Sequence, residues 1–112
     1  MAKIPVVPFG GSGGIVCGTY TGDNASSQSI LLGFRPKAVL VFRSDGQVSA
    51  TGWNVSQWNR CGGLALDGNP CAIESQNIVE TTDTGFLVFS HGSTPVVSTN
   101  EAKSTYYYIA FR

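Results

Sequence analysis

The chain has 112 residues, of which 42% are hydrophobic and only 12% are charged, and its seven basic and seven acidic side chains give a formal net charge of zero. This length suits one domain that can bury a core without disulfides or metal ions. A neutral chain lacks the basic surface that neutralises phosphates, which excludes nucleic acid as an expected partner. High hydrophobicity without net charge excludes disorder, and no apolar run approaches the ~20 residues of a membrane span.

Residues 1–14 form a segment distinct from the rest of the chain. Pro5 and Pro8 interrupt a short apolar strip, and a glycine-rich run follows it at 10–14. Proline blocks helix and the glycines remove stiffness, so this segment is either a flexible tail or an extended strip held by a partner. We predict an N-terminal anchor and linker at 1–14 and one domain at 15–112. The anchor residues are Ile4, Pro5, Val6, Val7, Pro8 and Phe9.

The rest of the chain is predicted to be all-β. Runs of β-branched and aromatic residues alternate with turn signals such as Asp45-Gly46, and no window shows a helical stripe. Seven short strands without a helix predict an antiparallel β-sandwich or barrel. The expected strands span residues 15–21, 28–32, 37–43, 62–66, 73–82, 85–90 and 103–112.

Several predicted strands are apolar on both faces. In the strand at 37–43, Leu40 and Phe42 lie on one face and Val39 and Val41 on the other. An antiparallel sheet normally leaves one face in water, and no helix is available to cover the second face. We therefore expect another subunit to cover it and the protein to be a homo-oligomer. The residues assigned to the subunit contact are Val39, Val41, Leu87, Tyr106 and Tyr108.

The three cysteines, Cys17, Cys61 and Cys71, have neither a zinc-site spacing nor a disulfide-rich pattern. We interpret them as small buried hydrophobic residues, with a Cys61–Cys71 bridge as the alternative. No metal site and no cofactor are predicted.

Two stretches, residues 44–60 and 91–102, resist assignment to strands. Long loops in a small domain are usually functional, and the first stretch combines two tryptophans with amide, hydroxyl and guanidinium groups. Aromatic rings with such donors and acceptors suit a neutral sugar, which presents hydroxyls and an apolar C–H face. The alternative is that the tryptophans belong to the core or an interface. The candidate ligand-binding residues are Trp53, Asn54, Gln57, Trp58, Asn59, Arg60 and His91.

The sequence offers little for catalysis. His91 is the only histidine, and no acid partner is identifiable for it by position. Asp23, Asp45 and Asp83 each neighbour Gly, Asn or Thr, as turn-forming aspartates do. We therefore expect a protein that is not an enzyme.

The order of several segments resembles modules of bacteriophage tail-fibre and other virion surface proteins, and is distantly similar to H-type lectin domains. The most specific segments are GFRP at 33–36, TGF at 84–86 and YYIAF at 107–111, and the resemblance covers about residues 18–112. H-type lectins carry Trp before the Ile-Ala pair where this chain has Tyr108, and their sugar-contacting residues have no clear counterparts here. Carbohydrate specificity is therefore not transferred.

The resemblance implies an antiparallel β-sandwich of six to seven strands that forms a homotrimer on a virion surface and contacts a host receptor or glycan. The tail at 1–14 would then dock the protein to other virion proteins. The start of the chain lacks the apolar core of a signal peptide, so we expect synthesis in the host cytoplasm. A head fibre or capsid decoration protein without a receptor role is an alternative, and a free-standing small lectin is a further one.

Overall fold

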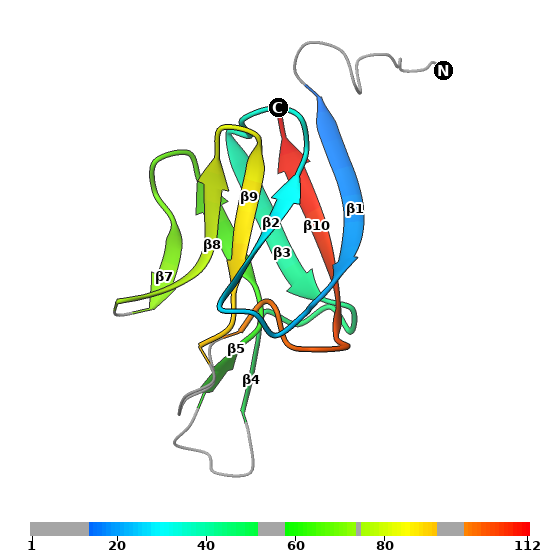
Figure 1. Cartoon of the computed structure of the whole chain (residues 1–112), viewed down its shortest axis with the longest axis vertical. Helices are drawn as coiled ribbons and strands as arrows, with labels where there is room; N and C mark the ends of the chain where they lie inside the picture. Colours follow the sequence, from blue (N-terminus) through cyan, green and yellow to red (C-terminus); the bar gives the residue numbers. More distant parts are fainter. Residues whose placement is uncertain (1–13, 52–57, 74, 92–97) are drawn as a thin grey trace.

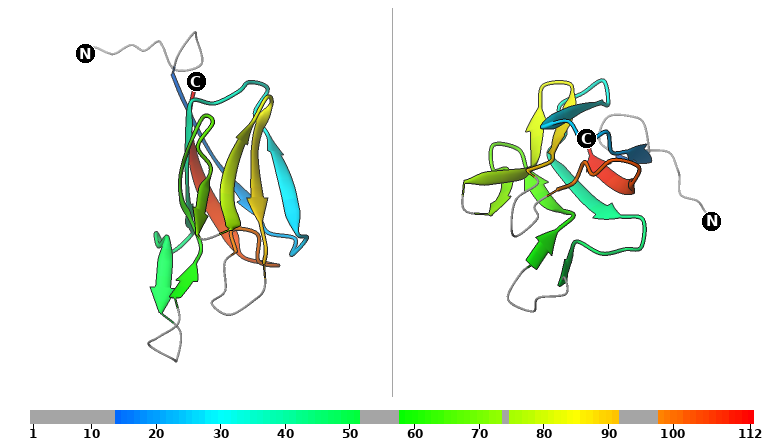
Figure 2. Two further views of the ribbon diagram at one scale, coloured as in Figure 1. Left: turned by 90° about the vertical axis from the view of Figure 1, so that its left-hand side faces the viewer. Right: turned by 60° about the horizontal axis from the view of Figure 1, so that its bottom comes forward.

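The computed structural model describes residues 14–51, 58–73, 75–91 and 98–112, and it contains two four-stranded antiparallel sheets that face each other (Figures 1 and 2). Sheet A has the order β1 (Ile15–Thr21), β10 (Thr105–Phe111), β3 (Ala38–Arg43) and β6 (Gly63–Leu66). Sheet B has the order β2 (Ser27–Leu31), β9 (Gly85–Phe89), β8 (Gln76–Thr82) and β7 (Cys71–Ile73). A separate two-stranded pair joins β4 (Ser49–Thr51) to β5 (Trp58–Arg60).

The all-β prediction is confirmed, with eight strands in the two main sheets instead of six to seven. The strand expected at 73–82 is in fact two, because β7 and β8 form a hairpin whose register shifts between Cys71 and Ala72. The stretch at 44–60, expected to be a loop, contains the β4–β5 pair. Its polar residues lack the apolar alternation by which the other strands were recognised.

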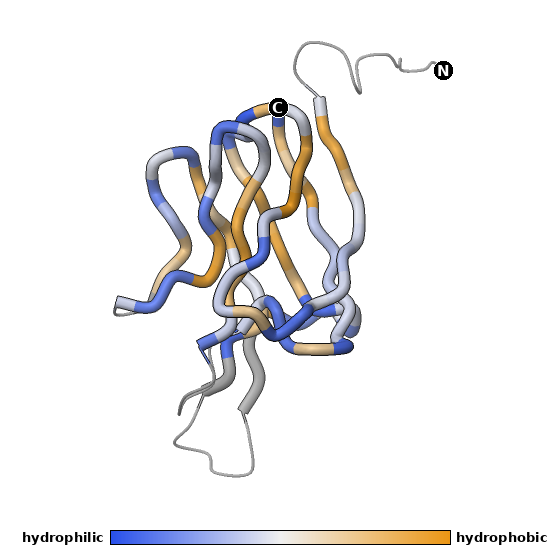
Figure 3. The backbone as a smooth tube through the Cα atoms, viewed as in Figure 1, coloured by the Kyte–Doolittle hydropathy of each residue, from blue (hydrophilic) through white to orange (hydrophobic). Residues whose placement is uncertain are grey.

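The core lies between the two sheets and is built from alternate residues of their strands. Phe86 and Val88 project from sheet B toward Tyr106 and Val41 of sheet A, and all four are at most 1% exposed. The rings of Tyr20 and Tyr106 stack at 5.1 Å between centroids, and Phe86 meets Tyr20 edge-on at 6.3 Å. Orange strands and blue connections in Figure 3 show the same division between apolar core and polar turns.

This core corrects the faces that we assigned to β3 and β10. Val39, Val41 and Tyr106, predicted at a subunit contact, are fully buried between the two sheets of one chain. Tyr108 also points inward, where its ring meets Phe86 edge-on at 5.1 Å. Sequence alternation separates two faces but does not say which one is inside when both are apolar. Leu87 lies on the outer face of sheet B, half-buried.

The cysteine prediction is also partly wrong. All three thiols are free, so there is no Cys61–Cys71 bridge. Cys61 is buried as expected, but Cys17 is exposed on the outer face of sheet A. Burial raises the pKa of the Cys61 thiol above its ordinary value of 9.0, which keeps that thiol protonated at neutral pH.

The sandwich has two distinct ends. At one end, the tail pole, Gly14 and Arg112 lie together, joined by a 2.9 Å hydrogen bond from Arg112 N to Gly14 O. At the other end, the loop pole, β4 and β5 project below the sandwich, and the connections from β1 to β2 and into β10 lie beside their base (Figures 1 and 2). The strands run between these poles, so Gly14 lies at the end remote from β4 and β5.

Replacing Phe86 by Ala should remove a fully buried ring from the centre of the core. We expect the free energy of unfolding to fall by about 3–5 kcal/mol, measured by urea denaturation at fixed protein concentration. Leu31→Ala is the control, because that side chain is 73% exposed and its truncation should cost under about 0.5 kcal/mol. Equal effects of the two substitutions would contradict this placement of the core.

Candidate functional site

The loop pole brings together the ends of the two stretches that we singled out from the sequence. Ser98 N donates to Arg60 O at 2.8 Å, which joins the end of β5 to the residue after 92–97. Ser98 also bridges to Ser90, and Thr99 N donates to Phe89 O at 2.8 Å. Thr99 Oγ1 donates to Ile78 O at 2.7 Å, and the Thr99 side chain is fully buried. The two stretches therefore leave the sandwich side by side.

The structure describes some of the candidate residues but not all of them. Strand β5 consists of Trp58, Asn59 and Arg60. In its pairing with β4, Trp58 lies opposite Thr51 and Arg60 opposite Ser49. Arg60 is half-buried. Trp53, Asn54 and Gln57 lie outside the described residues, so their role stays a prediction.

His91 helps to fix the end of β9. Its Nε2 lies 2.6 Å from Asn77 O, and since a carbonyl can only accept, Nε2 carries the proton and donates. The imidazole also stacks on Phe89, with 6.1 Å between ring centroids. The neighbouring Ser90 hydroxyl donates to Asn24 Oδ1 at 3.3 Å. This geometry orients His91 through the main chain and leaves Nδ1 as an acceptor in the neutral ring.

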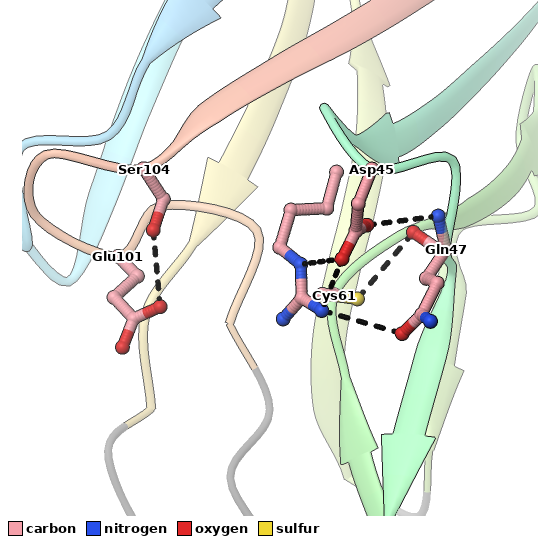
Figure 4. Close-up of polar contacts among 6 residues, drawn as sticks. Asp45, Gln47, Cys61, Glu101 and Ser104 are labelled. Atoms are coloured by element: carbon pink, nitrogen blue, oxygen red, sulfur yellow. Dashed lines mark hydrogen bonds and ion pairs between the residues drawn. The ribbon is translucent and has the colours of Figure 1, made fainter.

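An ion pair supports the base of the β4–β5 pair (Figure 4). Arg43 donates to Asp45 Oδ2 from Nη2 at 2.6 Å and from Nε at 3.1 Å. Arg43 Nη2 also donates to Gln47 Oε1 at 3.2 Å, and the Cys61 thiol donates to Gln47 O at 3.4 Å. The turn therefore holds the chain at the point where it enters β4. Asp45 was interpreted as a turn former, and this is confirmed because its Oδ1 accepts from Gln47 N at 3.1 Å.

A second polar cluster, which sequence reasoning missed, is centred on the fully buried Asn100. Its Nδ2 donates to Asp23 Oδ1 at 2.6 Å and to Ala25 O at 3.0 Å, and its Oδ1 accepts from Gln28 Nε2 at 2.6 Å. Asp23 also accepts from Ala25 N at 2.9 Å, which confirms its role as a turn former. The contacts link residues more than 70 positions apart, and no local pattern signals them.

Close backbone packing completes the loop pole. Gly22 N donates to Ser104 O at 2.9 Å, and a Cβ at Gly22 would lie 2.1 Å from Glu101 O, so this position requires glycine. Ser104 Oγ donates to Glu101 Oε1 at 3.1 Å (Figure 4), and Glu101 N donates to the Tyr106 hydroxyl at 3.1 Å. The segment before β10 is thus tied to both the core and the turn after β1.

The electrostatics of the loop pole are mild. The Arg43 guanidinium, by hydrogen bonding, holds the pKa of Asp45 below its ordinary value of 3.8. The hydrogen bond from Ala25 N, followed by that from Asn100, lowers the pKa of Asp23 in the same way. The described part of the chain holds no group of three His, Cys, Asp or Glu side chains that could bind a metal ion. Amides, hydroxyls and one ion pair thus hold the loop pole together by hydrogen bonds to one another.

The tail pole is held by different contacts. Arg35 forms ion pairs with Asp67 at 2.7 Å and Asp83 at 2.6 Å, and all three side chains are exposed. The Arg112 guanidinium lies 4.7 Å from the ring centroid of Phe34. The predicted anchor residues at 4–9 precede this pole and lie outside the described residues.

Comparison with known proteins gives no match to a family model, a curated protein or a solved structure. The described residues form no helix that could traverse a lipid bilayer.

Replacing Arg43 by Gln should raise the pKa of Asp45 toward 3.8, because the charged donor is lost. In the native protein the lowered pKa means that Asp45 stabilises the fold above about pH 4 and loses this contribution as the pH falls below 3.8. The carboxyl carbon shift of Asp45, followed by NMR during acid titration, measures the pKa. Arg35→Gln is the control and should leave the pKa of Asp45 unchanged; an unchanged value in Arg43→Gln would show that the ion pair does not form in solution.

Proposed function

We propose that this protein is a non-enzymatic virion surface protein of the fibre type. Its loop pole binds a host receptor or surface glycan, and its tail at 1–14 docks it to other virion proteins. The observation that supports this division of roles is the separation of the poles: residues 1–13 precede Gly14 at one end, and both candidate recognition stretches leave the sandwich at the other. A protein anchored through its tail would present the loop pole outward.

The composition of the loop pole supports a neutral ligand. The hydrogen bonds that hold the ends of the stretches in place are made by the amide side chains of Asn100, Gln28 and Gln47. The carboxylates of Asp23 and Asp45 also take part. The residues between those ends, 52–57 and 92–97, contain Trp, Asn, Gln, Ser and Thr. The composition of these residues matches sites that combine an aromatic surface with hydrogen-bonding groups.

The homotrimer belongs to the same proposal. Three sites on one rigid head bind a repetitive surface with an avidity that exceeds the affinity of each site, without any new contact. Weak single sites of the millimolar class would then suffice for attachment. The net charge of zero is also consistent with a partner recognised by hydrogen bonds and stacking instead of by long-range electrostatic attraction.

A double substitution tests the loop pole. Trp53→Ala with Trp58→Ala should lower binding of the full chain to an array of neutral oligosaccharides and bacterial surface polysaccharides by at least tenfold, because the stacking surface is lost. The melting temperature should change by only a few degrees. Trp53→Phe with Trp58→Phe, which keeps aromatic rings, should retain part of the binding, and Arg35→Ala at the tail pole should retain all of it.

Two results would contradict the binding role. One is a wild-type chain that binds no component of the array and no intact bacterial cell. The other is a large loss of stability in the double Ala variant, which would place the tryptophans in the core. For the tail, Val7→Asp with Phe9→Asp should abolish incorporation into virions, scored by immunoblotting of banded particles, and should leave array binding unchanged. If these tail variants are incorporated normally, the docking role of residues 1–14 is wrong.

A further inference from the structure

The outer face of sheet A is apolar across all four strands in two successive rows of its register. In one row Ile15, Phe111, Ala38 and Leu66 lie side by side across the four strands. In the next row Cys17 and Ile109 lie beside Leu40 and Leu64. In a third row Phe42 and Tyr107 meet edge-on, with 6.0 Å between ring centroids, and Thr19 of β1 lies beside Tyr107. We call this surface the apolar face: Ile15, Cys17, Ala38, Leu40, Phe42, Leu64, Leu66, Tyr107, Ile109 and Phe111.

Several large side chains of the apolar face are well exposed in the single chain. Leu64 is 52% exposed and Leu66 47%, and Ile15, Tyr107 and Phe111 each exceed a third. Four strands spaced ~4.8 Å apart give a face roughly 20 Å wide. Soluble monomers seldom expose a contiguous apolar patch of more than a few hundred Å², so a surface of this kind marks an interaction site.

The opposite sheet provides an internal comparison. On the outer face of sheet B, Ser29 and Glu80 flank Leu87 in one row. Thr82 lies in the next row beside Gly85 and the isolated Leu31. This mixture is what an antiparallel sheet shows when one face meets water. The two outer faces of one sandwich therefore differ: sheet A has two rows that are apolar across all four strands, whereas each paired outer row of sheet B contains a polar side chain, Ser27, Ser29 with Glu80, or Thr82.

The chemistry of the apolar face favours a second copy of this chain as its occupant. The face carries no charged side chain, so nothing on it attracts an acidic or a basic partner. An extended sheet face is complementary in shape to another of its kind, since sheets pack face to face at about 10 Å with strands within about 30° of alignment. The chain has no net charge, so two copies meet without long-range repulsion.

We propose that the apolar face of sheet A is the self-association surface of this protein. The inference deepens the oligomer of the proposed function and replaces the inward-facing residues first assigned to it. It does not depend on what the loop pole binds. Because the strands run from pole to pole, copies packed through this face around an axis parallel to the strands place their loop poles at the same end.

Charged substitutions on the apolar face test the proposal. Leu64→Lys with Leu66→Lys places two ammonium groups where each side chain is already about half exposed, so one chain can fold around them. Light scattering coupled to gel filtration at micromolar concentration should give a multiple of 11.8 kDa for the wild type and the mass of one chain for the variant. Leu31→Lys, on the outer face of sheet B, is the matched control and should keep the wild-type mass.

Thiol labelling provides a second measurement that does not need a variant to fold. Cys17 is exposed in one chain and lies within the apolar face, whereas Cys61 is buried in the core. A bulky maleimide should modify Cys17 at least tenfold more slowly when the wild-type protein is concentrated than when it is diluted to dissociation. The rate at Cys61, resolved by peptide mass spectrometry, should not follow the oligomeric state.

Three results would overturn the inference. The first is a wild-type chain that remains a monomer at high concentration with Cys17 freely labelled. The second is a Leu64→Lys, Leu66→Lys variant that keeps the oligomeric mass. The third is a monomer in which Cys17 is protected until Val6→Lys with Val7→Lys is introduced, because the tail would then cover the face. Loss of array binding with the oligomer intact would instead count only against the loop pole.

Discussion

The stack of Tyr20 on Tyr106 fixes the inward direction of the two strands that carry them, and the rest of the structure depends on this parity. The rings lie nearly parallel, 13° apart, at 5.1 Å between centroids. Because side chains alternate along a strand, turning Tyr106 inward also turns Tyr108 and Ala110 inward and sends Tyr107 and Ile109 outward. A slip of one residue in the register would exchange the two sets. The inward direction of Tyr20 and Tyr106 therefore determines both which residues form the core and which form the apolar face.

The same two tyrosines connect the core to the loop pole. The Tyr20 hydroxyl donates to Thr99 O, and the Tyr106 hydroxyl accepts from Glu101 N. Burial raises the pKa of Tyr20 far above its ordinary value of 10.0, so its hydroxyl remains a donor over the whole accessible pH range. Asn100, which lies between Thr99 and Glu101 in the chain, forms side-chain hydrogen bonds with Asp23 and Gln28. The ends of the two candidate stretches are therefore tied to the aromatic core.

The sequence predicted what depends on local chemistry. Strand β1 has the expected bounds, and the turns at Asp23 and Asp45 have the expected side-chain hydrogen bonds. It did not predict the inward face of β3, because Leu40 and Val41 are equally apolar and only the opposing sheet decides between them. It also missed the Asn100 cluster, whose partners come from distant parts of the chain, and the β4–β5 pair, whose polar residues lack an apolar alternation.

The distribution of charge explains how a chain with so few charged residues divides its surface. Arg35 with its two aspartates lies at the tail pole, and Arg43 with Asp45 lies at the loop pole. Exposed pairs of this kind contribute little to stability, so their value lies in fixing turns and in keeping the ends of the sandwich hydrated. Charge on the outer face of sheet A would oppose the packing of copies, and none is placed there. The low charge of the chain is therefore the composition expected if, as we propose, the sandwich is hydrated at its poles and on sheet B and is covered by a second copy on sheet A.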